Sequence, residues 1–395
     1  MRGARRRQAP ASGKKGENMD RYLGESTPKL GFGFMRLPKL DDGTIDIDQT
    51  KQMVDRFMDA GLTYFDTAFV YDNGESEKAL KAALIDRYPR DSFTVATKLN
   101  ALMQAPNKEA AHQQFFTSLE RTGAGYFDYY LLHALQKGNL DKYDEYDAWN
   151  FVKEQRDAGL IKHWGFSFHD SPELLDKLLT EHPDVDFIQL QINYADWEDP
   201  KQASRANWEV ARKHQVPVVV MEPVKGGLLA NPVPQVADIL REANPAASCA
   251  SWAIRFAASL DGIITVLSGM STLSQVEDNV SYMRNFKPLT EDERAVVERA
   301  QQKLAAIDSI PCTGCHYCTD GCPMHIPIPD IFSAYNRKLV WDDAEGARRR
   351  YEDAVSAEGA GRASDCIACG QCENACPQNL PIIELLQRCA EAFDA

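Results

Sequence analysis

From about Leu30 to Met283, short runs rich in β-branched and aromatic residues alternate with longer segments of helical periodicity. The strand-like runs number eight and cover residues 29–35, 62–68, 93–99, 127–135, 161–168, 185–193, 216–223 and 262–270. Between them, segments such as 46–61 and 142–159 carry apolar residues at spacings of three and four, which is typical of an amphipathic helix. These two end in Gly61 and Gly159, as helices often do, because glycine readily adopts positive φ.

Eight such units in about 250 residues match the size and strand count of a (β/α)₈ barrel. The rival architecture, a doubly wound sheet, carries a Gly-x-Gly-x-x-Gly turn after its first strand, and the sequence GFGFMR at 31–36 lacks it. We therefore predict an α/β fold, with a (β/α)₈ TIM barrel over 28–288. Residues 289–395 are predicted to form a linker helix, at 290–307, and a small, mostly helical domain that contains the cysteines.

Residues 1–27 differ in composition from the rest of the chain. Six Lys or Arg residues precede Met19, together with Gly, Pro and Ser, so an irregular or disordered segment is expected, and Met19 is an alternative start. No apolar run follows, as a secretory signal needs, and no run approaches the ~18 apolar residues of a membrane span. A formal net charge of −14 argues against nucleic-acid binding. We predict a cytoplasmic protein with no nucleic-acid or membrane partner.

Eight of the ten cysteines lie between residues 312 and 376, in two runs of the form C-x₂-C-x₂-C-x₃-C-P that begin at Cys312 and Cys366. Disulfide frameworks occur mostly in small secreted chains, whereas such runs in a large protein without a secretory signal more often bind metal. Zinc usually takes two C-x₂-C pairs separated by a spacer, so iron is favoured. Thiols of this kind persist in a reducing cytoplasm.

The spacing resembles that of bacterial ferredoxins with two [4Fe-4S] clusters, in which the fourth cysteine of each run binds the cluster of the other run. By this resemblance, Cys312, Cys315, Cys318 and Cys376 hold one cluster, and Cys366, Cys369, Cys372 and Cys322 hold the other. Clusters joined in this way must lie close together, which favours electron transfer, and clusters that only stabilise the fold are the alternative. Cys249 and Cys389 lie outside the runs and are predicted to be inert thiols.

Four polar residues fall at or just after the ends of three consecutive strand-like runs. Asp66 ends the second run, with Tyr71 five residues later, Lys98 ends the third and His133 the fourth. Catalytic residues of barrels gather at the carboxyl ends of strands. A lysine charge beside a phenol stabilises the phenolate and lowers its pKa from about 10, an aspartate fixes the lysine, and an imidazole orients a carbonyl oxygen. The set predicts a general acid for carbonyl reduction.

These residues and their surroundings resemble the aldo-keto reductase family over residues 28–284. The matching segments are GLTYFDTAFVYDNGESEKALKAAL at 61–84, ATKL at 96–99 and DYYLLHAL at 128–135. The resemblance implies that Tyr71 is the acid, that Asp66 and Lys98 tune it, and that His133 positions the substrate. With its cysteine runs, the whole chain resembles the ferredoxin-tailed branch of that family.

The family binds a nicotinamide dinucleotide, and its site maps in part onto this sequence. Ser167 and Gln191 match residues that hold the carboxamide, whereas Phe168 and Met221 replace an asparagine and a ring-stacking tyrosine of many members. The segment PVKGGLLA resembles the loop over the pyrophosphate, whose contact residues here are Pro223, Gly226 and Gly227. Glycine amides approach a phosphate closely, and a simple turn is the alternative for this glycine pair.

The segment LSGMSTLSQVEDN at 267–279 departs from the family pattern. Many members place a lysine and an arginine there to bind the 2′-phosphate of NADPH, but Gly269 and Gln275 stand at those positions, while Asp278 and Asn279 keep the match on the adenine side. Losing two cations removes charge-assisted hydrogen bonds that distinguish NADPH from NADH. The resemblance therefore implies NAD(P)H without choosing its form, and a donor other than nicotinamide stays open.

A nicotinamide transfers two electrons as hydride, whereas a [4Fe-4S] cluster passes one electron at a time, and the sequence has no flavin motif to join them. In the first interpretation, a small-molecule aldehyde or ketone is reduced with NAD(P)H, and the clusters tune stability or accept electrons from a ferredoxin or another carrier. In the second, the clusters supply the electrons and Tyr71 the protons. In the third, a non-catalytic barrel serves electron transfer or binding, which the intact set of Asp66, Tyr71, Lys98 and His133 argues against.

Overall fold

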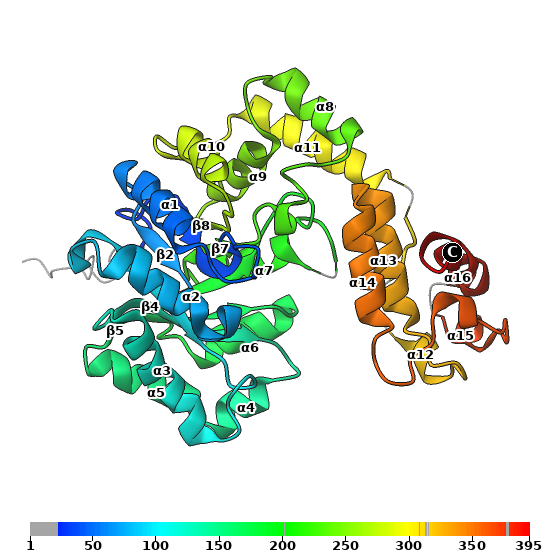
Figure 1. Cartoon of the computed structure of the whole chain (residues 1–395), viewed down its shortest axis with the longest axis horizontal. Coiled ribbons are helices and arrows are strands. Elements are labelled where there is room, and N and C mark those ends of the chain that lie inside the picture. The colour runs from blue at the N-terminus through cyan, green and yellow to red at the C-terminus, as the bar shows by residue number, and fades with distance from the viewer. Residues whose placement is uncertain (1–22, 201, 308, 313, 315, 377–378) are drawn as a thin grey trace, which may run out of the picture. The chain divides into compact units, whose positions relative to one another are not determined.

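The computed structural model describes residues 23–395 with the exception of 201, 308, 313, 315, 377 and 378 (Figure 1). Most of the predicted irregular segment 1–27, and Cys315, therefore lie outside the described residues. The chain divides into two compact units. The first comprises the chain up to Ile192 together with Ser204–Met221 and Ala257–Phe286, and the second comprises Asn193–Ala203, Glu222–Phe256 and Lys287–Ala395.

The first unit is built around eight parallel strands that form a closed barrel. The strands are β1 (Leu30–Gly33), β2 (Tyr64–Asp66), β3 (Thr94–Leu99), β4 (Phe127–Leu135), β5 (Ile161–Phe168), β6 (Phe187–Gln191), β7 (Val218–Met221) and β8 (Ile263–Ser268). Each strand pairs in parallel with the next one in the sequence, and β8 pairs with β1, which closes the ring. The predicted barrel is confirmed, and each predicted strand run contains one observed strand.

Helices follow the strands in the first unit, as the alternation of sequence patterns predicts. They are α1 (Ile47–Asp59), α2 (Glu75–Leu80), α3 (Lys108–Thr122), α4 (Leu140–Glu145), α5 (Ala148–Asp157), α6 (Pro172–Glu181), α7 (Ser204–Lys213) and α10 (Leu273–Met283). Gly61 and Gly159 follow α1 and α5 with φ of 78° and 77°. Both glycines therefore hold the left-handed conformation expected after a helix.

The segment 142–159, predicted as a single helix, is divided between α4 and α5. The break lies at Asp147, whose φ of 53° is left-handed. Its carboxylate accepts hydrogen bonds from Lys108 Nζ at 3.0 Å and from Asn150 Nδ2 at 2.7 Å. Apolar spacing continues across the break, so the periodicity could not reveal it, and the partner Lys108 is distant in sequence.

An aromatic cluster attaches α1 to the two strands that lead into the predicted catalytic residues. The ring of Phe57 on α1 lies 5.4 Å from the rings of both Phe32 on β1 and Phe65 on β2, and all three side chains are fully buried. Burial of each such side chain contributes about 1.5–3 kcal/mol. Because side chains alternate along a strand, the outward packing of Phe65 places its neighbour Asp66 on the inside of the barrel.

The second unit is mostly helical, as predicted for the C-terminal region. Its helices are α8 (Pro234–Ala243), α9 (Cys249–Ala258, whose last two residues belong to the first unit), α11 (Glu291–Ala305), α12 (Tyr317–Asp320), α13 (Ile328–Trp341), α14 (Ala344–Ala354), α15 (Gln371–Ala375) and α16 (Ile382–Phe393). α11, the predicted linker helix, begins with a capping box between Thr290 and Glu293. α13 and α14 lie side by side (Figure 1). No helix among the described residues combines the length and apolar character that crossing a membrane requires.

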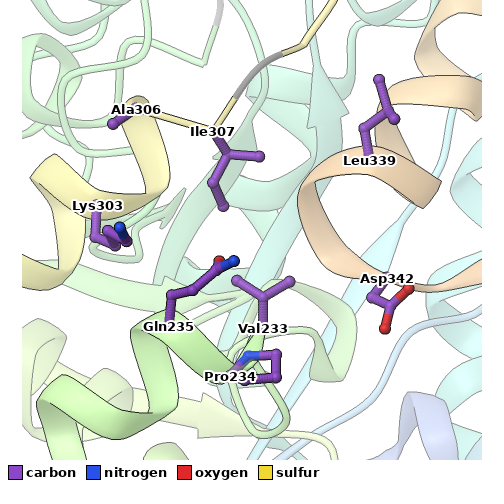
Figure 2. A pocket seen from close by; sticks show the side chains of 8 residues that line it. All are labelled: Val233, Pro234, Gln235, Lys303, Ala306, Ile307, Leu339 and Asp342. Carbon is purple, nitrogen blue, oxygen red and sulfur yellow. The ribbon is translucent and has the colours of Figure 1, made fainter.

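A pocket of about 380 Å³ lies within the second unit (Figure 2). Its lining comes from the start of α8, the end of α11 and the end of α13, through Val233, Pro234, Gln235, Lys303, Ala306, Ile307, Leu339 and Asp342. None of the site residues predicted from the sequence lines this pocket among those described. The domain boundaries predicted at 28–288 and 289–395 stay a prediction.

Candidate active site and cysteine pocket

The four predicted catalytic residues come together at the carboxyl ends of three adjacent strands. Asp66 is the last residue of β2, Lys98 lies one residue before the end of β3, and His133 lies near the end of β4. Tyr71 begins the 3₁₀ turn Tyr71–Gly74 that follows β2. The parallel pairing of β2 with β3 and of β3 with β4 brings these ends to one side of the barrel.

Lys98 is the centre of this group. Its ammonium donates to Asp66 Oδ1 and to the carbonyl of Thr67, both at 2.6 Å, and reaches Tyr71 Oη at 3.4 Å. The side chain of Lys98 is fully buried. A fully buried ammonium is costly unless it is paired and hydrogen-bonded, and the three oxygens around Nζ meet that need. The geometry therefore holds a fixed positive charge beside the phenol.

Burial and charge act against each other on this ion pair. Burial disfavours the charged form of Lys98, but the nearby Asp66 carboxylate and Tyr71 phenol outweigh that effect and leave the pKa of Lys98 above its usual value. Burial raises the pKa of Asp66, while Lys98 and Gln189 oppose that rise. Lys98 is consequently protonated at neutral pH and can act only as a donor.

The imidazole of His133 lies beside Tyr71, with the two ring centroids 5.6 Å apart and the planes at 77°. Burial, followed by the charge of Lys98 and the neighbouring His169, holds the pKa of His133 well below its usual range. Its Nδ1 is buried without a hydrogen-bond partner among the described residues. His133 is therefore a neutral imidazole at pH 7, which has one donor nitrogen and one acceptor nitrogen.

One buried partner of the ion pair was not foreseen from the sequence. Gln189 on β6 donates to Asp66 Oδ2 at 3.4 Å and is 2 % exposed. A polar residue two positions before Gln191 on the same strand shares its inward face, and this alternation was the available signal. Gln189 and Lys98 together bind both oxygens of Asp66, which fixes the orientation of the carboxylate.

The predicted nicotinamide residues of the first unit lie at or after the ends of successive strands. Ser167 is next to the end of β5, Gln191 ends β6, Met221 ends β7, and Gly269 follows β8. Gln191 and Met221 are register partners in the sheet, while Ser167 Oγ accepts a hydrogen bond from the amide of Ala134 at 2.6 Å. The structure places them on the same rim as the catalytic group, and their contact with a cofactor stays a prediction.

The segment after β8 is occupied by contacts within the protein. Gln275 Oε1 accepts from the amide of Ser271 at 2.7 Å, and this closes the first turn of α10. Asn279 donates to Ser268 Oγ at 2.8 Å and accepts from Tyr282 Oη at 2.5 Å. These hydrogen bonds give Asn279 a structural role, while its second N–H and its second oxygen lone pair are still available to a ligand. Its adenine contact stays a prediction.

The predicted pyrophosphate loop belongs to the second unit. Gly226 and Gly227, in the 3₁₀ turn Lys225–Gly227, have φ of 64° and 101°, so glycine is required for the backbone as well as for any close approach of a phosphate. Lys225 forms an ion pair with the buried Asp196. Pro223 precedes the turn. The fold explains these glycines without a ligand, and the phosphate role stays a prediction.

Four cysteines from the two runs line one pocket in the second unit. Its lining comprises Cys322, Cys366, Cys369 and Cys372 with Pro323, Met324, Ile326, Ile328, Ile367, Ile383 and Leu386. These are the four cysteines assigned to one cluster by the ferredoxin-like spacing, including the fourth cysteine of the other run. Sulfur ligands surrounded by aliphatic side chains fit an iron-sulfur cluster.

The other predicted ligand set is described only in part, because Cys315 lies outside the described residues. Cys318 is a buried member of the apolar core that includes Phe332 and Leu386, and Cys312 and Cys376 pack against that core. Among the described residues, no three His, Cys, Asp or Glu side chains are grouped to hold a single metal ion. Support for clusters in the structure therefore comes from the four-cysteine pocket.

Comparison with known families assigns both regions. Residues 29–302 match the model of the aldo/keto reductase family, and residues 311–381 match that of a 4Fe-4S dicluster domain. This chain belongs to the aldo/keto reductase family. It is an oxidoreductase that combines a barrel of that family with a C-terminal iron-sulfur domain.

Two relatives and two solved structures show how far the similarity extends. An uncharacterized oxidoreductase of Bacillus subtilis is 24% identical over 70% of this chain and 97% of its own length. L-galactose dehydrogenase of Arabidopsis thaliana is 25% identical over 70% of this chain and 92% of its own. The holo form of a Bacillus halodurans aldo-keto reductase has a TM-score of 0.58 and 27% identity, and the match covers 70% of this chain and 94% of that one. A Klebsiella pneumoniae aldo/keto reductase in complex with NADP and acetate, 22% identical, shares the fold with a TM-score of 0.57 over 70% of this chain and 93% of that one.

Proposed function

We propose that this aldo/keto reductase reduces an aldehyde or ketone with NAD(P)H as hydride donor and Tyr71 as the general acid. The observation that carries the proposal is the buried ammonium of Lys98, which lies between Asp66 at 2.6 Å and Tyr71 Oη at 3.4 Å. A positive charge held there stabilises the phenolate that forms when Tyr71 gives up its proton. A charge that the fold already holds in place stabilises the transition state more than a mobile charge does.

The reaction balances with the groups at hand. The reduced nicotinamide supplies a hydride to the carbonyl carbon, and the carbonyl oxygen takes the proton of Tyr71, so the products are an alcohol and the oxidised dinucleotide. Lys98 stabilises the resulting phenolate until solvent restores its proton. His133, kept neutral, donates a hydrogen bond that holds the carbonyl oxygen near Tyr71. Asp66 keeps Lys98 in place, aided by Gln189.

The nicotinamide site is proposed on the rim residues Ser167, Gln191 and Met221, with Pro223, Gly226 and Gly227 near the pyrophosphate. The adenosine end would lie by Gly269, Gln275 and Asn279, which carry no positive charge. Because neither position 269 nor position 275 is a lysine or arginine, a 2′-phosphate would form no charge-assisted hydrogen bonds with these two side chains. NADH and NADPH are therefore both proposed as donors, with a small difference between their affinities.

The C-terminal domain is proposed to hold two [4Fe-4S] clusters, one on Cys322, Cys366, Cys369 and Cys372 and one on Cys312, Cys315, Cys318 and Cys376. The four-cysteine pocket supports the first set. It also favours a second function, in which electrons from a ferredoxin or another carrier enter through the clusters while Tyr71 supplies protons. A cytoplasmic location is part of the proposal, because thiolate ligands persist under reducing conditions.

The test is anaerobic purification, followed by a screen of NADH, NADPH and reduced ferredoxin as donors for 4-nitrobenzaldehyde. Tyr71→Phe is expected to lower turnover by about 100-fold or more with unchanged iron content. Tyr126→Phe is the matched control, because Tyr126 Oη also accepts from a lysine, Lys162, at 3.3 Å, yet has no proposed part in the chemistry. Equal turnover of Tyr71→Phe and the wild type would refute the proposal. Turnover with ferredoxin alone would select the second function.

A further inference from the structure

Tyr71 is followed by an unusual backbone. Asp72, Asn73 and Gly74 are three consecutive residues with left-handed φ values of 49°, 54° and 92°. Asp and Asn tolerate this region better than other non-glycine residues do, but three such residues in a row fix an irregular turn. Contacts from outside the turn help to set where it places Tyr71.

Arg121 on α3 provides such contacts. Its Nη1 donates to the carbonyl of Phe69 at 3.2 Å, and its guanidinium lies 4.4 Å from the centroid of the Phe69 ring. The same group lies against Gly74, where an added Cβ would be only 2.6 Å from the guanidinium carbon. Arg121 thus contacts the chain two residues before Tyr71 and three residues after it.

Glu77 connects this arginine to the strand that carries Lys98. Glu77 is fully buried and accepts from Arg121 Nη1 at 3.3 Å and from Thr97 Oγ1 at 2.8 Å. Thr97 is the residue before Lys98 on β3, and side chains alternate along a strand. Thr97 therefore reaches outward to Glu77, while Lys98 reaches inward to Tyr71.

We propose that Arg121 and Glu77 are positioning residues that set the distance between Tyr71 Oη and Lys98 Nζ. One side of the Arg121–Glu77 pair binds the turn that carries Tyr71, and the other side binds β3 beside Lys98. The inference rests on the proposed role of Tyr71 as the acid. Neither residue touches the reacting atoms, so both act through the position of the phenol.

Removing Arg121 is expected to do two separable things. It leaves the buried Glu77 without its cation, which destabilises the fold, and it releases the Phe69 carbonyl, which lets Tyr71 move away from Lys98. Misplacement by about 1 Å can cost ~100-fold in rate. A phenol farther from an ammonium also titrates closer to its ordinary pKa of about 10, so the alkaline limb of the rate profile should move to higher pH.

The experiment uses the full-length holoprotein with 4-nitrobenzaldehyde and the better nicotinamide donor. Arg121→Gln is compared with the double variant Arg121→Gln, Glu77→Gln, which leaves no unpaired buried charge. Both are expected to lose ~10-fold to ~100-fold in kcat, with unchanged cofactor affinity and an alkaline limb shifted upward. Only the double variant is expected to regain thermal stability. Arg121→Lys, which keeps the charge, should recover part of kcat.

Arg90 provides a matched control on the other end of β3. Like Arg121, Arg90 donates to the backbone, here to the carbonyls of Phe93 and Tyr126, and its guanidinium lies over the ring of Tyr126. It also forms an ion pair at 2.7 Å with the largely buried carboxylate of Asp128. Arg90→Gln is expected to lower stability without moving the pH limb. This control separates loss of positioning from general destabilisation.

The outcomes are distinguishable. If Tyr71→Phe keeps full activity, the proposed function fails and this inference with it. If Tyr71→Phe is inactive but Arg121→Gln keeps the wild-type kcat and pH limb, only the inference fails. Return of the wild-type pH limb in the double variant would likewise overturn it, because stability rather than position would then explain the effect.

Discussion

The rim of the barrel and the cysteine pocket of the second unit are organised in opposite ways. At the rim, a buried ammonium and carboxylate satisfy each other, and Gln189, Thr67 and Tyr71 complete their hydrogen bonds. In the pocket, sulfur atoms lie among aliphatic side chains, and Cys369 is exposed. The first site is complete within the polypeptide, whereas the second depends on a metal group to hold its ligands together.

The largest effect is expected from breaking the ion pair at the rim. Lys98→Met keeps the length of the side chain but leaves Asp66 buried without its cation, so unfolding free energy should fall by about 3–5 kcal/mol and turnover by ~100-fold or more. Chemical denaturation and steady-state kinetics measure the two. Lys162→Met is the control, because Lys162 pairs with Asp128 at 2.8 Å while 52 % exposed, and exposed pairs contribute under about 1 kcal/mol. Equal losses of unfolding free energy and turnover in the two variants would contradict a larger contribution from the buried Asp66–Lys98 pair.

The next effect concerns the cysteine pocket. Cys366→Ser is expected to lower the iron and sulfide bound per chain and to lower the melting temperature of the second unit, while NAD(P)H binding persists. Cys389→Ala is the matched control. Cys389 is fully buried in the same apolar core and lies outside both cysteine runs, so it has no proposed part in binding iron. Loss of iron from the control would contradict the ligand assignment.

The smallest expected effect concerns pH. Because the pKa of His133 is held below its unfolded value near 6.5, the unfolded chain binds a proton first as pH falls, and stability is lost below about pH 6.5. Partial exposure of this side chain reduces the effect below the limit of about 1.4 kcal/mol per pH unit. His133→Gln should therefore lose less stability between pH 6.5 and pH 5.5 than the wild type, as measured by urea unfolding. If the unfolding free energies of the two proteins fell in parallel over this pH range, the lowered pKa of His133 would be contradicted.

Much of the architecture was predictable from local pattern. Eight strand-sized, β-rich runs that alternate with segments of helical periodicity predicted the (β/α)₈ barrel, because each strand-helix unit must bury one face against its neighbours. The positions of Asp66, Lys98 and His133 at strand ends were predictable for the same reason, since a closed parallel barrel brings these ends together. The division of 142–159 at Asp147 was missed, because the decisive partner, Lys108, belongs to another helix.

The sequence by itself determined the types of chemistry present: a lysine, a phenol, a carboxylate and an imidazole at strand ends, and thiols at cluster spacing. Only the tertiary structure decided what supports them. Gln189 on β6 binds Asp66, Arg121 on α3 contacts the turn that carries Tyr71, and Cys322 joins Cys366 in one pocket. Local pattern records which face a residue occupies, but hydrogen bonds between distant segments depend on distances that arise only when the chain has folded.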